Sequence, residues 1–264
     1  MILENIILVI GLIGLGSLAK KSLIFPENTA DVLNKFILNI SLPAIIMVSI
    51  PKLVVDSNML IPVIVHWIAF IIHIALLFGA SKIFKFSRPV FGALLIVTSL
   101  GNTAFLGIPM VNSFLGPDAV PYAVLYDQLG SGFGFILMAA FVLPRYVGKE
   151  VGSLKKVFGN LIKFPPFVGL ALGFIFMIVP LPGVVENYLS SLSATLIPCA
   201  MIAVGFQMKY ILPKTTLLPI AVGLWIKLFL LPIIIIIGVS FFDKTIAIKT
   251  AVLQSGMPPM ITAG

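Results

Sequence analysis

The feature that most constrains this chain is a succession of nine apolar segments, separated by short breaks that carry charge or Pro and Gly. In lipid, every backbone N–H and C=O needs a partner within the protein, so long apolar runs predict membrane-spanning helices. The sequence therefore predicts an all-α polytopic membrane protein. The predicted segments cover residues 5–19, 36–50, 59–80, 89–115, 119–143, 163–180, 190–208, 216–241 and 245–264.

Composition favours the same class of protein and argues against others. Hydrophobic residues make up 60% of the 264 residues and charged residues only 10%, whereas soluble domains carry about 25% charged residues. The single cysteine, Cys199, excludes an intramolecular disulfide and an all-cysteine metal site. We expect no metal and no organic cofactor, and the chain has no ATP-binding motif.

The distribution of basic residues predicts an orientation in the membrane. The net charge is +8, and 13 of the 17 Lys and Arg residues lie in loops after odd-numbered segments. The positive-inside rule places these loops in the cytoplasm and the N-terminus outside the cell. We therefore expect a multi-pass protein of the cell membrane, whose basic residues reflect topology and not binding to nucleic acid. The 13 residues are Lys20, Lys21, Lys35, Lys82, Lys85, Arg88, Arg145, Lys149, Lys155, Lys156, Lys163, Lys209 and Lys214.

The fourth segment contains a polar interruption at residues 101–109 (GNTAFLGIP). It brings an Asn-Thr pair and two glycines to membrane depth, and Pro109 removes a backbone donor. Such an interruption is tolerated where it packs in protein or lines a wet cavity, and secondary transporters build their sites from broken helices. We therefore predict a broken helix and a binding site here.

The two halves of the chain are similar, which predicts two repeats over residues 1–158 and 159–264. A complete repeat would have five segments, an odd number, so the second repeat would enter the membrane from the opposite side. The mate of the fifth segment would begin beyond Gly264, so we expect a truncated copy of a ten-helix fold with about nine helices present. The matching pairs are Gly11 and Gly169, Pro43 and Pro198, and Pro109 and Pro259, at offsets of 158, 155 and 150 residues.

The chain resembles the auxin efflux carrier family over all 264 residues in helix order. In that family the fourth helix carries an Asn-Thr pair followed by Gly-x-Pro, as in Asn102-Thr103 and Gly107-Ile108-Pro109 here. The ninth-helix pattern, residues 251–259, is similar too, as are the prolines of segments 2 and 7. The chain departs from the plant members in lacking a long loop between segments 5 and 6, in lacking a tenth helix, and in having Gln254 where they tend to have proline.

This resemblance implies a fold of two inverted five-helix repeats, like that of sodium–bile acid symporters. It also implies that helices 4 and 9 cross at their breaks and hold the substrate, with the N-terminus outside the cell. Bacterial relatives are associated with small carboxylates such as malate or malonate, and plant relatives with auxin. We therefore expect a secondary transporter of a small organic anion in a lipid bilayer, with a second copy of the chain as a candidate partner in a homodimer.

Polar residues at the two breaks are the candidate substrate ligands. Asn102 and Thr103 can donate hydrogen bonds to a carboxylate, and half-helix N-termini add N–H groups and positive dipole ends. Gln254 and Ser255 are their counterparts at the second break. The alternative is that these side chains only satisfy freed backbone carbonyls. The predicted site comprises Gly101, Asn102, Thr103, Gly107, Pro109, Gln254, Ser255, Pro258 and Pro259.

Ionisable residues within the segments are the candidates for coupling. Asp127 is the only acidic residue well inside a predicted segment, and Lys227 is the only base deep in one. A buried carboxylate usually faces a cavity or a partner, so Asp127 could bind Na⁺ or exchange H⁺. The alternative is a fixed pair with Lys227, which could instead attract the anion or extend to the membrane surface. His66 and His73 share one helix face and could line the pathway or sense pH, but we expect both to be packed and hydrogen-bonded. Their spacing does not suit a metal site.

Two other functions stay open at this point. A sodium-coupled symporter of the bile-acid type would need converging oxygen ligands, and Thr103, Asp127 and Gln254 could supply them. An intramembrane enzyme would need a nucleophile with a base or a metal cluster, but the chain has no His-Glu-x-x-His or Gly-x-Ser-x-Gly motif, so we expect no enzyme. Residues 130–134 (GSGFG) lack the lysine of a phosphate loop, and we expect their glycines to permit close helix packing.

Overall fold

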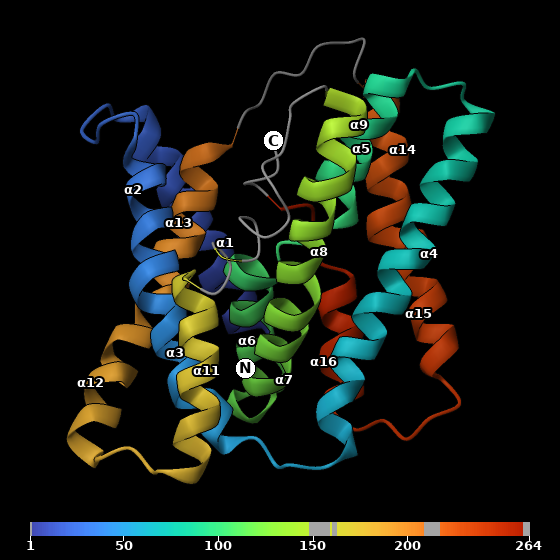
Figure 1. Cartoon of the computed structure of the whole chain (residues 1–264). Coiled ribbons are helices and arrows are strands. Elements are labelled where there is room, and N and C mark those ends of the chain that lie inside the picture. Colours follow the sequence, from blue (N-terminus) through green and yellow to red (C-terminus); the bar gives the residue numbers. More distant parts are fainter. Residues whose placement is uncertain (1, 148–158, 160–162, 209–216, 261–264) are drawn as a thin grey trace. The chain divides into compact units, whose positions relative to one another are not determined.

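The structure, a computed structural model, describes residues 2–147, 159, 163–208 and 217–260 (Figure 1). These residues are almost all helical and form no β-strand, apart from an isolated bridge between Gly101 and Pro259. The predicted all-helical class is therefore confirmed. Five helical stretches are long and apolar enough to cross a membrane: Thr29–Lys52, Ser57–Ile83, Pro117–Tyr146, Gly183–Gln207 and Leu217–Val239. Shorter apolar stretches cover Arg88–Ser99, Thr103–Leu115 and Pro165–Ile178.

The chain divides into two compact units, each of which draws on both halves of the sequence. The first comprises Met1–Leu53, Ala104–Val124 and Ile162–Tyr210, and the second comprises Val54–Thr103, Leu125–Leu161 and Ile211–Gly264. This spatial division is a different property from the predicted repeats over 1–158 and 159–264, which stay a prediction. Residue 158 lies outside the described residues, as do five of the basic residues used to predict the orientation: Lys149, Lys155, Lys156, Lys209 and Lys214.

Helices of the first unit follow predicted segments 1, 2, 6 and 7, the second part of segment 4 and the first part of segment 5. They are α1 (Ile2–Lys21), α2 (Thr29–Phe36), η1 (Ile37–Ser41), α3 (Leu42–Ser49), η2 (Ile50–Lys52), α6 (Ile108–Leu115), η5 (Pro117–Ala119), α7 (Val120–Leu125), α11 (Pro165–Ile178), α12 (Gly183–Ala194) and α13 (Leu196–Gln207). The π-helix η4 (Thr103–Gly107) begins in the second unit and continues into the first, and the last residue of α7 belongs to the second unit.

Glycines allow the helices of the first unit to approach closely. Helix α1 lies against α13, where a β-carbon on Gly16 would overlap the backbone carbonyl of Ile202 (Figure 1). In the same way, α11 lies against α3, where a β-carbon on Gly173 would meet Ile46 and Ile50. Small residues at such contacts let backbones pack tightly, which is a main source of helix association in lipid.

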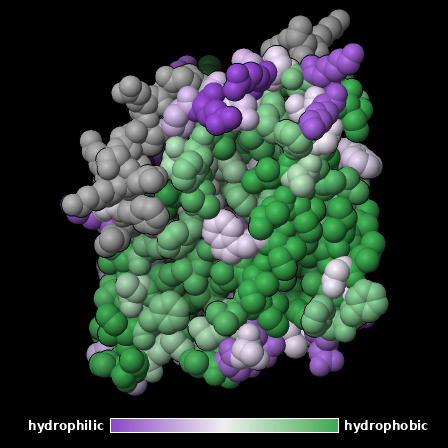
Figure 2. All heavy atoms as spheres, turned by 45° about the vertical axis from the view of Figure 1, so that its right-hand side comes forward, coloured by the Kyte–Doolittle hydropathy of each residue, from purple (hydrophilic) through white to green (hydrophobic). Residues whose placement is uncertain are grey.

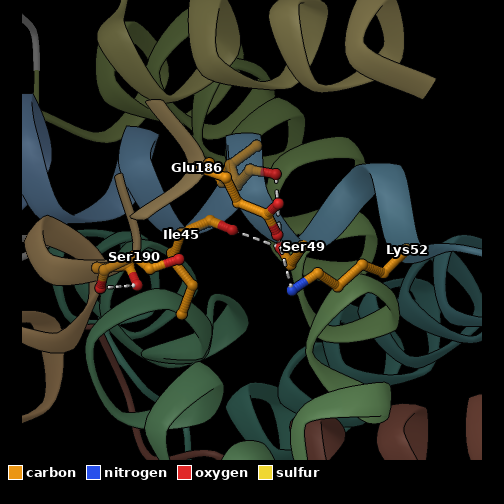
Figure 3. A network of polar contacts seen from close by, with 7 residues as sticks. Ile45, Ser49, Lys52, Glu186 and Ser190 are labelled. Atoms are coloured by element: carbon orange, nitrogen blue, oxygen red, sulfur yellow. Dashed lines mark hydrogen bonds and ion pairs between the residues drawn. The ribbon is translucent and has the colours of Figure 1, made fainter. Parts of the chain in front are cut away.

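An ion pair on the surface of the first unit joins η2 to α12. Lys52 Nζ lies 3.5 Å from Glu186 Oε1, and nearby Ser49 Oγ donates a hydrogen bond of 2.5 Å to the Ile45 carbonyl of its own helix (Figure 3). Both charged side chains are exposed, so the pair contributes at most about 1 kcal/mol to stability. We therefore assign it no role in the site.

Helices of the second unit follow predicted segments 3, 8 and 9, the first part of segment 4 and the remainder of segment 5. They are η3 (Ser57–Leu60), α4 (Ile61–Ile83), α5 (Arg88–Ser99), η6 (Tyr126–Gly132), α8 (Phe133–Leu137), η7 (Met138–Val142), α9 (Leu143–Val147), α14 (Leu217–Trp225), η9 (Ile226–Leu230), α15 (Leu231–Val239) and α16 (Ile246–Ser255).

Helix α4 is the centre of the second unit, because it contacts α5, α15, α16 and η6 (Figure 1). One core cluster combines Val65 of α4 with Tyr126, Leu231 and Ala251 from three other elements. The outer surface of the unit is also apolar, as the broad hydrophobic face in Figure 2 shows. Its exposed side chains include Ile64, Ile68 and Ile71 of α4 and Ile233, Ile236 and Ile237 of α15. An apolar outer surface fits a lipid environment.

Prolines explain most of the π-helical turns. A proline has no N–H and its ring clashes with the carbonyl four residues earlier, so a wider turn just before it relieves the helix. Four of the described π-helices, η1, η4, η7 and η9, end two residues before a proline, namely Pro43, Pro109, Pro144 and Pro232. Because η4 accommodates Pro109 in this way, the helix continues through residues 103–115. The predicted interruption at 101–109 is thus shorter than expected and lies before Thr103.

Candidate functional site

The centre of the site is a stretch of non-helical backbone after α5. Helix α5 ends at Ser99, and Leu100 is extended, with φ −106° and ψ 128°. The Asn102 amide donates a hydrogen bond of 2.7 Å to the Pro258 carbonyl, and the Met260 amide donates one of 3.1 Å to the Leu100 carbonyl. These bonds flank the antiparallel bridge between residues 101 and 259. The segments that follow α5 and α16 therefore pair with each other in an extended conformation.

The residue types in these two segments suit this pairing. Pro258 and Pro259 cannot donate backbone hydrogen bonds, so the chain leaves the helix after Ser255 while their carbonyls stay available as acceptors. Opposite them, a β-carbon on Gly101 would lie 3.4 Å from Met257, which is an ordinary van der Waals distance. The pairing satisfies backbone groups that would otherwise be unpaired at membrane depth.

Gln254 connects the end of α16 to the start of η4. Its Nε2 donates a hydrogen bond of 3.2 Å to the Thr103 carbonyl, and both side chains are fully buried. Ser255 behaves differently, because its hydroxyl donates to the Val252 carbonyl of its own helix at 2.7 Å. In the structure, Ser255 therefore bonds a backbone carbonyl, which was the alternative to a role in substrate binding.

Asp127 lies beside Thr103 and is held by neutral donors. Thr103 Oγ1 donates to Asp127 Oδ1 at 2.5 Å, and Gln128 Nε2 donates to Asp127 Oδ2 at 2.7 Å. Ser131 Oγ lies 2.9 Å from Thr103 Oγ1, so two side chains of η6, Asp127 and Ser131, contact this threonine, while Gln128 contacts Asp127. Asp127 forms no ion pair with Lys227 within the part of the chain that the structure describes, so the alternative of a fixed pair is wrong.

A small cavity lies next to this cluster in the second unit. Its volume is about 10 Å³, which is near the minimum that one water molecule needs. Lys227, only 4% exposed, contributes the positive charge of its wall. The lining residues are His66, Ala69, Phe70, Ser99, Gly101, Thr103, Tyr126, Lys227 and Leu231.

The two histidines of α4 differ in their surroundings. His73 Nε2 lies 3.0 Å from Thr98 Oγ1, whose hydrogen is donated to the Leu94 carbonyl, so the histidine must be the donor. His66 packs edge-on against Tyr126, with ring centroids 4.8 Å apart, and neither of its ring nitrogens has a hydrogen-bond partner among the described residues. The expectation of a hydrogen-bonded histidine is thus confirmed for Nε2 of His73, whose Nδ1 has no partner among the described residues, and it is wrong for His66.

The glycines of residues 130–134 explain how His66 fits. A β-carbon on Gly130 would overlap the His66 ring, and one on Gly134 would lie 2.8 Å from Leu100 Cδ2. The prediction that these glycines permit close helix packing is confirmed. They bring η6, which carries Asp127, against α4.

The second unit brings together most of the residues predicted for the site. Gly101, Asn102 and Thr103 lie at one segment, Gln254, Ser255, Pro258 and Pro259 at the other, and Asp127 beside them. Gly107 at the end of η4 and Pro109 in α6 belong to the first unit and are buried there.

Sequence reasoning missed four side chains. Ser131 could have been found from its spacing to Asp127, four residues along the same helix, whereas the adjacent Gln128 has no such signal. Nothing in the sequence indicated that Ser99 lines the cavity or that the ring nitrogens of His66 lack hydrogen-bond partners among the described residues. Both features depend on which helices meet at the cavity.

Comparison with known proteins identifies relatives over the length of the chain. Residues 1–264 match the family described as membrane transport protein. An uncharacterized transporter of Methanocaldococcus jannaschii is 28% identical over 216 residues, which cover 78% of this chain and 69% of that protein. An uncharacterized transporter of Methanothermobacter thermautotrophicus is 23% identical over 266 residues, which cover 98% of this chain and 86% of that protein.

Proposed function

Because the chain belongs to the membrane transport protein family over residues 1–264, we propose that it is a secondary transporter of a small organic anion. Family membership confirms the resemblance to auxin efflux carriers and the expectation of a multi-pass membrane transporter rather than an enzyme. The anionic substrate, such as a small carboxylate or an auxin-like acid, is our proposal, as are location in the cell membrane and an extracellular N-terminus. The membrane potential could drive export, since an anion leaving a negative-inside cell gains roughly 2.3 kcal/mol per charge per 100 mV.

The observation that carries this proposal is the backbone pairing between residues 100–102 and 258–260. We propose that it is the crossing of two broken helices, which is where secondary transporters bind substrate. Asn102, Thr103 and Gln254 would recognise the substrate there. Their amide and hydroxyl groups suit a carboxylate, which accepts several hydrogen bonds.

Support for an inverted repeat comes from the first unit. Gly173 follows Gly16 by 157 residues, and Ile202 follows Ile46 by 156 residues. We propose that the contact of Gly16 with Ile202 corresponds to that of Gly173 with Ile46 when the two halves are exchanged, and Gly173 also approaches Ile50. Ser41 Oγ and Thr195 Oγ1, 154 residues apart, lie 2.7 Å from each other, as expected for equivalent residues near a two-fold axis. We infer that the second half repeats the first in inverted orientation.

Asp127 is our candidate for coupling. A carboxylate that is held only by neutral donors can gain a proton or attract a cation without first breaking an ion pair. Binding of a proton or of Na⁺ to Asp127 would then change its hydrogen bond to Thr103. Because Thr103 also belongs to the proposed crossing, this change would alter the substrate site. A sodium-coupled symporter is the second candidate, and its ligands would be the oxygens of Thr103, Asp127 and Ser131.

Transport by the purified chain in proteoliposomes tests the proposal. We expect radiolabelled malonate, malate or indole-3-acetate to move in response to an imposed membrane potential, and we expect Asn102→Ala to abolish this flux. Lys249→Met, a change at an exposed residue of α16, is the control and should transport like the wild type. Flux that requires Na⁺ would favour the symporter, and no flux of any anion would refute the proposed function.

A further inference from the structure

We propose that Lys227, with His66 and Ser99, forms a subsite that receives one carboxylate oxygen of the transported anion. The inference rests on the proposed function and names the group that would neutralise the substrate. None of these three side chains is in the substrate site predicted from the sequence, although attraction of the anion was one of the roles open to Lys227 there. All three line one cavity of the second unit, together with Gly101 and Thr103 from the proposed crossing.

Lys227 is a buried cation without a counter-ion among the residues that the structure describes. Its side chain is only 4% exposed on η9, and no carboxylate pairs with it within the described residues. The nearby carboxylate, Asp127, is instead engaged by Thr103 and Gln128. A buried charge is expensive unless it is paired or hydrogen-bonded. A cavity next to such a charge will therefore favour an anion.

The end of α5 lies at the same cavity as Lys227. Helix α5 ends at Ser99, whose side chain lines the same cavity. The C-terminus of a helix carries the negative end of its dipole and stabilises a nearby cation. This interaction is worth only about 0.3–1 kcal/mol at exposed sites, so it supports the ammonium without replacing a counter-ion.

His66 and Ser99 supply hydrogen bonds that the protein itself does not use. Both ring nitrogens of His66 and the hydroxyl of Ser99 are buried without a partner among the described residues. A neutral imidazole and a hydroxyl can each donate one hydrogen bond, and the ammonium can donate three. Three donors around one cavity suit an acceptor atom with negative charge, whereas the ammonium repels a metal cation.

The size of the cavity limits what can enter. Its volume of about 10 Å³ admits a single group about as large as a water molecule. A carboxylate oxygen has that size, while the rest of the anion would extend toward Gly101 and Thr103. The subsite would thus select substrates that carry a negative charge. The remaining polar groups of the substrate would be recognised by Asn102, Thr103 and Gln254.

Binding of matched acids and amides to the full chain tests this inference. The probes are indole-3-acetate with indole-3-acetamide, and malonate with malonamide, measured by thermal shift and by flux in proteoliposomes. We expect Lys227→Met to weaken acid binding at least tenfold while leaving amide binding unchanged, and Lys227→Arg to keep most of the preference for the acid. Without ligand, Lys227→Met should unfold at a higher temperature than the wild type, because it removes an uncompensated buried charge.

Two further variants and a measurement with chloride complete the test. Ser99→Ala is a small change that should fold normally and weaken acid binding several-fold, and Lys249→Met is the exposed control of equal charge. Acid binding by Lys227→Met at wild-type strength would overturn the subsite while leaving the proposed function intact. Stabilisation by chloride alone would also overturn it, in favour of a halide site. If no acid binds to the wild type or crosses the bilayer, the proposed function fails first.

Discussion

Thr103 and Asp127 are joined by a hydrogen bond of 2.5 Å that connects the start of η4 to the buried carboxylate of η6. Thr103 also accepts, through its backbone carbonyl, the hydrogen bond from Gln254 at the end of α16. One residue thus links the proposed crossing to the proposed coupling group. A change in the charge of Asp127 would alter its hydrogen bond to Thr103. We expect this to shift the backbone that pairs residues 100–102 with 258–260.

Removal of the Thr103 hydroxyl should therefore change the ion dependence of transport in a protein that still folds. Thr103→Val keeps the shape of the side chain and the backbone carbonyl but leaves Asp127 with one donor fewer. We expect a loss of about 1–3 kcal/mol in stability, as for other buried groups left without a partner, and a change in the pH or Na⁺ dependence of flux. Thr103→Ser restores the hydroxyl and should behave like the wild type. Wild-type flux and ion dependence in the valine variant would exclude this bond from coupling.

Gln254 should be needed for the geometry of the crossing. Gln254→Met has a similar length but cannot donate to the Thr103 carbonyl, which would stay buried and unpaired. We expect a lower unfolding temperature, from a loss of about 1–3 kcal/mol, together with a loss of flux. The control is Thr250→Val on the same helix, since the Thr250 hydroxyl only bonds the Ile246 carbonyl of its own helix. If both variants lose the same activity, the effect belongs to α16 as a whole and not to the bond with Thr103.

The sequence was sufficient to predict the helices but not how their side chains meet. Lipid leaves helices as the main way to satisfy the backbone of an apolar chain, so apolar runs and charged breaks locate them well. The extent of the interruption was predicted wrongly, because a π-turn lets the helix pass Pro109. Likewise, nothing in the sequence distinguishes the partnered His73 from the unpartnered His66, since the difference lies in Thr98 of another helix.

Gly130 should be essential for the contact between η6 and α4. The added methyl group of Gly130→Ala would overlap the His66 ring, and overpacking of this kind costs about 1–3 kcal/mol. We expect a lower unfolding temperature and a weaker preference for acids over amides, because the ring lines the proposed subsite. Gly79→Ala on α4 is the matched control, since a β-carbon there meets nothing within 4 Å. It should be neutral or stabilising, because alanine favours a helix more than glycine does. Equal effects of the two changes would argue against a tight contact at His66.

The proposed equivalence of the two halves predicts that matched substitutions in the first unit have matched effects. Gly16→Ala would drive a methyl group into the Ile202 carbonyl, and Gly173→Ala would place one 2.9 Å from Ile50 Cβ and 3.3 Å from the Ile46 carbonyl. Both should lower the unfolding temperature, and Gly16→Ala should do so more strongly, because a backbone carbonyl yields less than a side chain. Gly14→Ala lies one half-turn from Gly16 on α1 and meets nothing within 4 Å, so it should leave the unfolding temperature unchanged or raise it. If Gly16→Ala lowered the unfolding temperature and Gly173→Ala did not, the two contacts would contribute differently to stability. The structural support for an inverted repeat would then be lost.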